Sequence, residues 1–84
     1  MTRLTIFIDA DLYASPRALH LALKLLLDLP EHYGCNADAL YDCLSGRAAP
    51  VNLCILSEGT GDTADALKKV IRVVEDLDGD VTRH

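Results

Sequence analysis

Two short apolar runs most strongly constrain how this chain can fold. They are LTIFI, from Leu4 to Ile8, and VNLCIL, from Val51 to Leu56. Runs of this length that are rich in β-branched residues indicate strands buried on both faces of a sheet. Helical patterns separate the two runs, and strands joined through helices pair in parallel with right-handed crossovers. The sequence therefore predicts an α/β fold on a small parallel sheet.

The segment between the two runs predicts two helices. Ser15 and Pro16 are a typical helix start, with an N-cap hydroxyl followed by proline at the first helical position. This helix should extend to about Asp28, and its wide apolar arc predicts that it is largely covered. His20 and Lys24 lie at a four-residue spacing with Asp28, which predicts the solvated face. Asn36 should cap a second helix that runs through Leu44 and ends at Gly46, as a C′ glycine.

A third amphipathic helix is predicted from Thr63 to Asp76, and Val81 with Thr82 is compatible with the start of a third strand. The inward positions of this helix are expected to be Leu67, Val70, Ile71, Val74 and Leu77. The order is β-α-α-β-α-β in a single domain over residues 1–84, with a sheet of two or three strands and three helices.

The formal net charge of −5 limits the possible partners. Nucleic acids and anionic membranes attract clustered Lys and Arg, so neither is an expected partner. A basic protein is compatible with this charge. No apolar run reaches the roughly 18 residues of a membrane span, and no signal peptide is recognisable. Three cysteines without a CxxC pair are not typical of a secreted disulfide framework, so we expect a cytoplasmic protein with reduced thiols.

The second helix carries the most unusual charge pattern. No Lys or Arg occurs between Lys24 and Arg47, and Asp38 and Asp42 lie four apart, on one helix face. Like charges at this spacing destabilise a helix by roughly 0.2–0.5 kcal/mol. The residues alone allow two interpretations, a solvated surface or a binding surface that includes Tyr41.

Other chemistry finds little support in the residues. Paired carboxylates that act on a sugar need a cleft between them, which a chain of this length seldom provides. His32, Cys35 and Cys43 form one loose cluster without the second ligand pair of a zinc site. Cys35 is expected as an exposed loop thiol, and Gly59 and Gly61 as loop residues. We therefore predict no catalytic residue, no metal site and no cofactor, and a protein that is not an enzyme.

Residues 29–46, LPEHYGCNADALYDCLSG, resemble the barstar family, whose pattern in this segment is close to LPxYYGxNxDALWDCLTG. Members of that family are small bacterial inhibitors of ribonucleases related to barnase. The resemblance implies a barstar-like fold and a basic, extracellular-type ribonuclease as partner, bound one to one inside the cell that makes it. It also implies that a loop and the second helix occlude the active site of the enzyme, where acidic side chains replace RNA phosphates.

The resemblance also implies roles for individual residues. His32 stands where the family usually has a Tyr that covers the catalytic His of the enzyme. Asp42 is the central carboxylate, Asp38 is the second one, and Tyr41 replaces a Trp. The full set of partner-binding residues expected on this basis is His32, Tyr33, Asn36, Ala37, Asp38, Tyr41, Asp42, Ser45 and Gly46.

Three positions differ from the family pattern. Val73 aligns with an acidic residue on the third helix that reaches the enzyme, and Arg47 stands where an aromatic residue is common. The last strand, which begins at Val81, is expected to be shorter than the full apolar strand usual in the family. The first two differences leave open an alternative, a barstar-fold interaction module that binds another basic protein or toxin.

Overall fold

A three-stranded parallel sheet forms one layer of the protein, in a computed structural model that describes residues 4–47 and 50–83. The strand order is β1-β2-β3, so β2 is central. The strands are β1 (Leu4–Asp9), β2 (Val51–Ser57) and β3 (Val81–Arg83). The helices are α1 (Pro16–Leu26), α2 (Ala37–Ser45) and α3 (Gly61–Asp76), with a short 3₁₀ turn, η1 (Ala10–Leu12), after β1. The predicted α/β order is confirmed, including the third strand.

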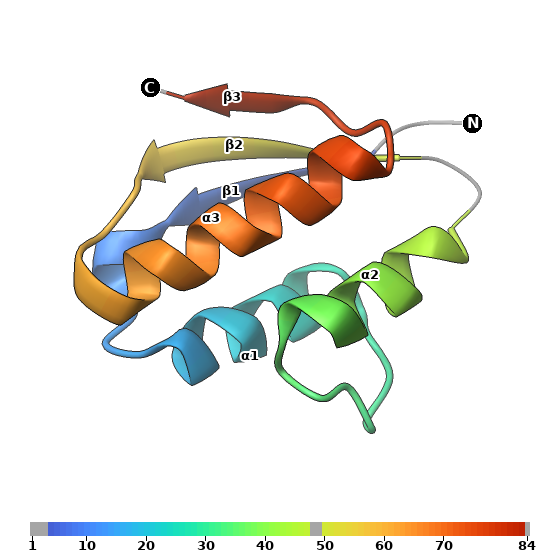
Figure 1. The fold of residues 1–84 in the computed structure, drawn as a ribbon, viewed down its shortest axis with the longest axis horizontal. Helices are drawn as coiled ribbons and strands as arrows, with labels where there is room; N and C mark the ends of the chain where they lie inside the picture. The colour runs from blue at the N-terminus through green and yellow to red at the C-terminus, as the bar shows by residue number, and fades with distance from the viewer. Residues whose placement is uncertain (1–3, 48–49, 84) are drawn as a thin grey trace.

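The helices cover one face of the sheet. Ile6 pairs with Leu53 and Ile8 pairs with Ile55, and all four side chains are buried beneath the helices. Phe7 points to the opposite face and is 60% exposed. The prediction that the first strand is buried on both faces is therefore wrong. β1 is an edge strand, and α1, α2 and α3 all lie on the same side of the sheet (Figure 1).

The long helix α3 is the centre of the fold. It lies between the sheet and the α1–α2 pair (Figure 1), and it contacts both of those helices as well as β2. Its predicted inward positions Leu67, Val70, Ile71 and Val74 are buried, and Leu77 is half-buried. Thr63 and Val73 are buried in addition. The helix starts at Gly61, two residues earlier than predicted. Because α3 contacts every layer, it sets where α2 stands.

The exposed and buried sides of α1 differ from the prediction. The helix starts as expected, with the Ser15 hydroxyl accepting a hydrogen bond from the Ala18 N–H at 3.2 Å. His20, however, is only 4% exposed, whereas Leu25 is 83% exposed. The predicted solvated face is thus wrong at His20, and the helix is not largely covered. Leu19, Leu23 and Leu27 define a narrower buried stripe than the apolar composition suggested.

Helix α2 begins as predicted and ends differently. The Asn36 side-chain oxygen accepts a hydrogen bond from the Ala39 N–H at 2.8 Å, which caps the helix. At the other end Gly46 has φ −85°, in the right-handed region, so it is not the left-handed C′ glycine that was predicted. In the preceding loop the positive φ is found at Cys35 (φ 55°) and not at Gly34. Helix α2 is thus a nine-residue element with a side-chain cap at its start.

In the part of the chain that the structure describes, no helix has both the length and the apolar character that a membrane crossing requires.

Candidate protein-binding site

The predicted binding residues lie in the loop before α2 and on α2 itself, and most of them are exposed. Leu40 and Leu44 turn inward from α2 and are buried, at 0% and 6% exposed. The opposite side of the helix is open to solvent. The exposed members of the predicted set are His32, Asn36, Asp38, Tyr41, Asp42, Ser45 and Gly46, and Ala37 is half-buried.

Asp38 and Asp42 carry the negative charge of this surface. Both are exposed, and within residues 4–47 and 50–83 neither carboxylate has a hydrogen-bond or ion-pair partner. The Ser45 hydroxyl donates to the backbone carbonyl of Asp42 at 3.0 Å, which leaves the Asp42 carboxylate free. Asp38 lies in the first turn, where the helix dipole favours a carboxylate. Neither carboxylate is paired within the described chain, and a cationic partner would reduce the repulsion between them.

Tyr33 differs from the rest of the predicted set because its side chain is buried. It is 7% exposed, and its hydroxyl shares a 2.6 Å hydrogen bond with Nδ1 of His20 on α1. Burial raises the pKa of Tyr33, with Cys35 and Cys43 adding to the effect, and burial lowers the pKa of His20. The Tyr33 side chain is thus a core contact between the loop and α1. The side chain leaves little surface exposed, and the role of Tyr33 in partner binding stays a prediction.

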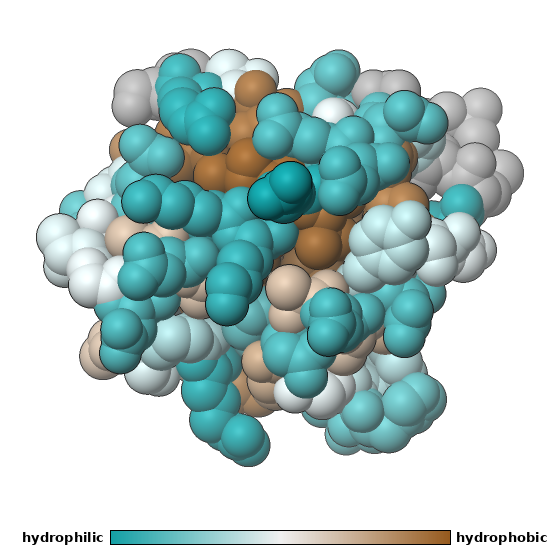
Figure 2. Space-filling view, viewed as in Figure 1, coloured by the Kyte–Doolittle hydropathy of each residue, from teal (hydrophilic) through white to brown (hydrophobic). Residues whose placement is uncertain are grey.

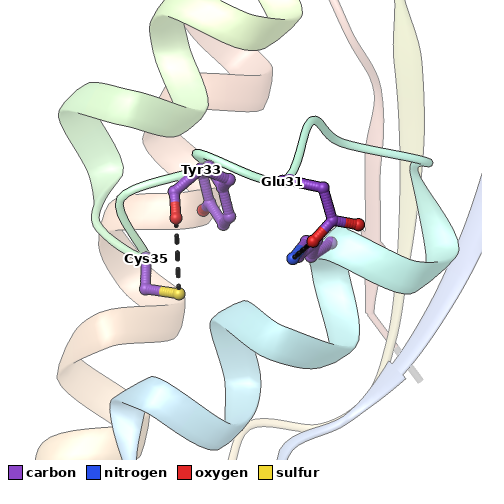
Figure 3. Close-up of polar contacts among 4 residues, drawn as sticks. Glu31, Tyr33 and Cys35 are labelled. Atoms are coloured by element: carbon purple, nitrogen blue, oxygen red, sulfur yellow. Dashed lines mark hydrogen bonds and ion pairs between the residues drawn. The ribbon is translucent and has the colours of Figure 1, made fainter.

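Short-range contacts fix the loop that precedes α2. The Tyr33 N–H donates to the Pro30 carbonyl at 3.0 Å, and the Asn36 amide donates to the Gly34 carbonyl at 3.2 Å. The Cys35 thiol lies beneath the Tyr33 carbonyl at 3.9 Å (Figure 3). Cys35 is half-buried rather than exposed as predicted, because its side chain packs against the core.

A second link joins the same loop to α1. The Lys24 ammonium and the Glu31 carboxylate form an ion pair at 3.3 Å, with Glu31 reaching from the loop toward α1 (Figure 3). Glu31 is 99% exposed, so this pair contributes little stability by itself. Like the buried hydrogen bond between Tyr33 and His20, it joins the loop to α1.

A groove between α2 and α3 adds residues that the sequence prediction missed. It has a volume of about 480 Å³ and is lined by Asn36, Ala37, Asp38, Tyr41, Lys69, Arg72, Val73 and Asp76. Figure 2 shows apolar surface between polar side chains where α2 lies beside α3. Val73 is buried at 8% exposed, and Lys69 and Arg72 are exposed. In the sequence, the pattern of α3 predicts only that Lys69 and Arg72 point away from the core. It does not say that they face α2.

Arg47, the other unusual position, points back toward α1. Its guanidinium donates to the Leu27 carbonyl at 3.5 Å, and the residue remains exposed. The cation therefore lies at the C-terminal end of α1, whose C-cap residue is Leu27.

The arrangement offers little to a catalytic or metal-binding interpretation. Asp38 lines the groove but Asp42 does not, so the two carboxylates do not face each other across a cleft. Among residues 4–47 and 50–83, no three His, Cys, Asp or Glu side chains are grouped as metal ligands. Cys54 is buried, and Cys43 is half-buried against the core. An exposed acidic helix beside a groove is a surface suited to another protein.

Fold and surface together define a small α/β protein with an acidic candidate interface on a short, capped helix. The family model described as Barstar (barnase inhibitor) matches residues 3–84, and the chain belongs to the barstar family. The chain is also similar to "Putative ribonuclease inhibitor YrdF" of Bacillus subtilis (strain 168). The two are 49% identical over 41 residues, which cover 49% of this chain and 45% of that protein. The match thus spans about half the length of this curated relative.

Proposed function

We propose that the protein inhibits a basic, barnase-like ribonuclease by binding to it and covering its active site. The observation that carries this proposal is the pair of exposed carboxylates, Asp38 and Asp42, on a capped helix of a barstar-family chain. The name of the Bacillus subtilis relative supports the ribonuclease as the class of partner. No bond is made or broken in this mechanism, so the protein would act as an inhibitor and not as an enzyme.

The mechanism follows from the chemistry of carboxylates. A ribonuclease must hold RNA phosphates with Arg and Lys side chains. A carboxylate accepts the paired N–H donors of a guanidinium in a similar geometry, as a short charge-assisted contact. Asp42 would take the central position, and Asp38 would support it from one turn earlier. The net charge of −5 would speed the encounter with a basic enzyme.

Neighbouring side chains would complete the contact surface. His32 is exposed in the loop, and Tyr41 is 43% exposed on α2. Both offer flat rings that can cover an enzyme side chain and exclude water. Tyr33 would support the surface from below through its bond to His20.

The fixed shape of the loop favours tight binding. The cap at Asn36, the turn at Pro30 and the buried Tyr33 hold the backbone before any partner arrives. A pre-ordered surface loses less conformational entropy on binding. We infer a one-to-one complex in the cytoplasm, where the inhibitor would protect the cell that makes the nuclease.

Inhibition assays test the proposal directly. The protein is mixed with each of a panel of barnase-type ribonucleases, and RNA cleavage is followed. We expect inhibition of at least one enzyme and its loss in Asp42→Asn. Glu75→Gln is the matched control, because it removes one exposed charge from α3 outside the groove. Absence of inhibition across the panel would refute the proposal, and equal effects of the two variants would refute the acidic face as the site.

A second candidate function is a barstar-fold module that binds another basic protein, such as a toxin that is not a ribonuclease. Arg47 and Val73, which differ from the family pattern, favour it. Affinity capture from the native host would decide between the two, because it identifies the partner without assuming an activity. Recovery of a ribonuclease supports the first candidate, and recovery of another basic protein with no ribonuclease supports the second.

A further inference from the structure

We infer that the partner inserts an acidic side chain into the groove between α2 and α3, where Arg72 receives its carboxylate. This inference rests on the proposed function and names the charge pattern that the ribonuclease must present. The nuclease would meet the acidic side of α2 with cations and the facing side of α3 with an anion.

The α2 wall of the groove carries one carboxylate, and the α3 wall carries two cations and one carboxylate, Asp76. Asp38 and Tyr41 stand on the α2 wall, and Lys69 and Arg72 stand on the α3 wall. Val73 lies buried between them as part of the floor. The groove therefore continues the candidate interface, because Asp38 belongs to both. A protein that covers Asp38 and Asp42 comes within reach of the cations on α3.

Arg72 is free to take a partner. It is exposed, and within the described residues its guanidinium makes no ion pair and no hydrogen bond. Asp76 follows it by one turn on the same wall, yet the two side chains form no ion pair. A guanidinium presents several N–H donors in a flat fork that matches a carboxylate. A partner carboxylate can therefore bind at Arg72 with both oxygens.

Lys69 is a weaker candidate for the anion contact because it lines two hollows. It lines the α2–α3 groove and also a neighbouring hollow that contains Asp62 and Asp65. Asp65 precedes it by four residues, a spacing that favours an ion pair on a helix. Arg72 lines the α2–α3 groove but not that neighbouring hollow. The specific anion contact is thus assigned to Arg72.

The inference has a consequence for specificity. A nuclease with an entirely basic face would be repelled by Arg72 and Lys69 while it is attracted by Asp38 and Asp42. A nuclease with one carboxylate beside its phosphate-binding cations would match both walls. Like-charge contact against the wrong partner is a common means of discrimination between related partners. Arg72 would therefore select among ribonucleases that all carry basic active sites.

Charge reversal at Arg72 tests the inference, because two explanations predict opposite signs. Arg72→Glu is compared with Lys68→Glu, which makes the same change in net charge at an exposed position of α3 outside the groove. If only overall attraction to a basic enzyme matters, the two variants should have similar inhibition constants, equal to that of the wild type or slightly lower. If Arg72 binds a carboxylate, Arg72→Glu should raise the inhibition constant about tenfold or more relative to Lys68→Glu.

The experiment uses the nuclease that the wild-type protein inhibits most strongly, with Asp42→Asn measured alongside. Inhibition that is lost in Asp42→Asn but unchanged in Arg72→Glu would overturn this inference and leave the proposed function standing. Inhibition of no nuclease by the wild-type protein would overturn the proposed function, and the inference with it. In the expected case, replacing the facing carboxylate of the nuclease with Lys restores inhibition by Arg72→Glu.

Discussion

Nδ1 of His20 and the hydroxyl oxygen of Tyr33 lie 2.6 Å apart in the interior, and they join α1 to the loop that carries the candidate binding surface. Their rings are tilted at 51°, with centroids 5.9 Å apart. In the part of the chain that the structure describes, every buried side-chain nitrogen and oxygen atom has a hydrogen-bond partner, including those of His20 and Tyr33. Because this contact is buried and joins two separate segments, its removal should have measurable effects.

Tyr33→Phe should destabilise the protein by about 1–3 kcal/mol, because it leaves a buried ring nitrogen of His20 without its partner. Urea denaturation followed by circular dichroism measures the free energy of unfolding. Tyr41→Phe is the matched control, since Tyr41 is 43% exposed, and it should change that free energy by less than about 0.5 kcal/mol. Equal stability of the two variants would contradict the role assigned to the buried bond.

Stability should also decrease as the pH falls below about 6.5, the ordinary pKa of His. Burial lowers the pKa of His20 in the folded protein, so below that pH the unfolded chain binds a proton that the folded protein does not. Unfolding is thereby favoured until the pH passes below the lowered pKa. Urea denaturation at several pH values, for wild type and His20→Gln, measures this contribution as a difference. Parallel pH profiles would show that His20 does not supply it.

Asp42→Asn should have effects of opposite sign on stability and on inhibition. It removes a like-charge contact with Asp38 one turn away, which should stabilise the protein by roughly 0.2–0.5 kcal/mol. The same change removes the proposed anchor for the cations of the nuclease. Thermal denaturation and the ribonuclease assay, run on one preparation, check both. A variant that loses both stability and inhibition would show that Asp42 supports the fold.

Leu40→Ala should cost about 2–5 kcal/mol, since Leu40 is fully buried beneath α2 and its truncation leaves a cavity. Leu25→Ala makes the same change at an 83% exposed position of α1 and should cost less than about 0.5 kcal/mol. Chemical denaturation compares the two. A large cost at Leu25 would mean that this exposed leucine is covered in solution.

Two glycines should respond oppositely to alanine. A Cβ at Gly79 would lie 2.6 Å from Cγ1 of Val74 and would also clash with the Val51 carbonyl, so Gly79→Ala should cost about 1–3 kcal/mol. At Gly46 the nearest atom to a new Cβ is the Cys43 carbonyl at 4.0 Å, and φ is −85°. Gly46→Ala should therefore stabilise the protein by up to about 1 kcal/mol, because it restricts the unfolded chain. Thermal denaturation of both variants checks the contrast.

The sequence predicted those parts of the fold that depend on local chemistry. Ser15 and Asn36 were identifiable as caps because each bonds to a backbone N–H only three residues away. The conformation at the end of α2 was not identifiable, because Gly46 adopts a right-handed helical conformation that most residues can adopt. The buried side of α1 was also missed. So many leucines in one helix define no unique stripe, and the choice of His20 over Leu25 for burial depends on Tyr33, thirteen residues farther along.

The same distinction applies to the candidate site. The exposed side of α2 followed from its own period, so the solvent exposure of Asp38 and Asp42 was predictable. The groove was not, because Tyr41 and Arg72 come from helices that meet only in the folded chain. The burial of Tyr33 was not predictable either, since a motif marks a residue as important without saying whether its side chain reaches the surface or the core.

Helix α2 carries its buried side chains, Leu40 and Leu44, and its exposed carboxylates in alternation along nine residues. Changes on the outward side therefore leave the packed side untouched. If α2 is the recognition element, such a helix can diverge in step with the nuclease it meets. The family fold would then be kept while the partner changes. Related inhibitors in different lineages would share a core but would not inhibit one another's nucleases.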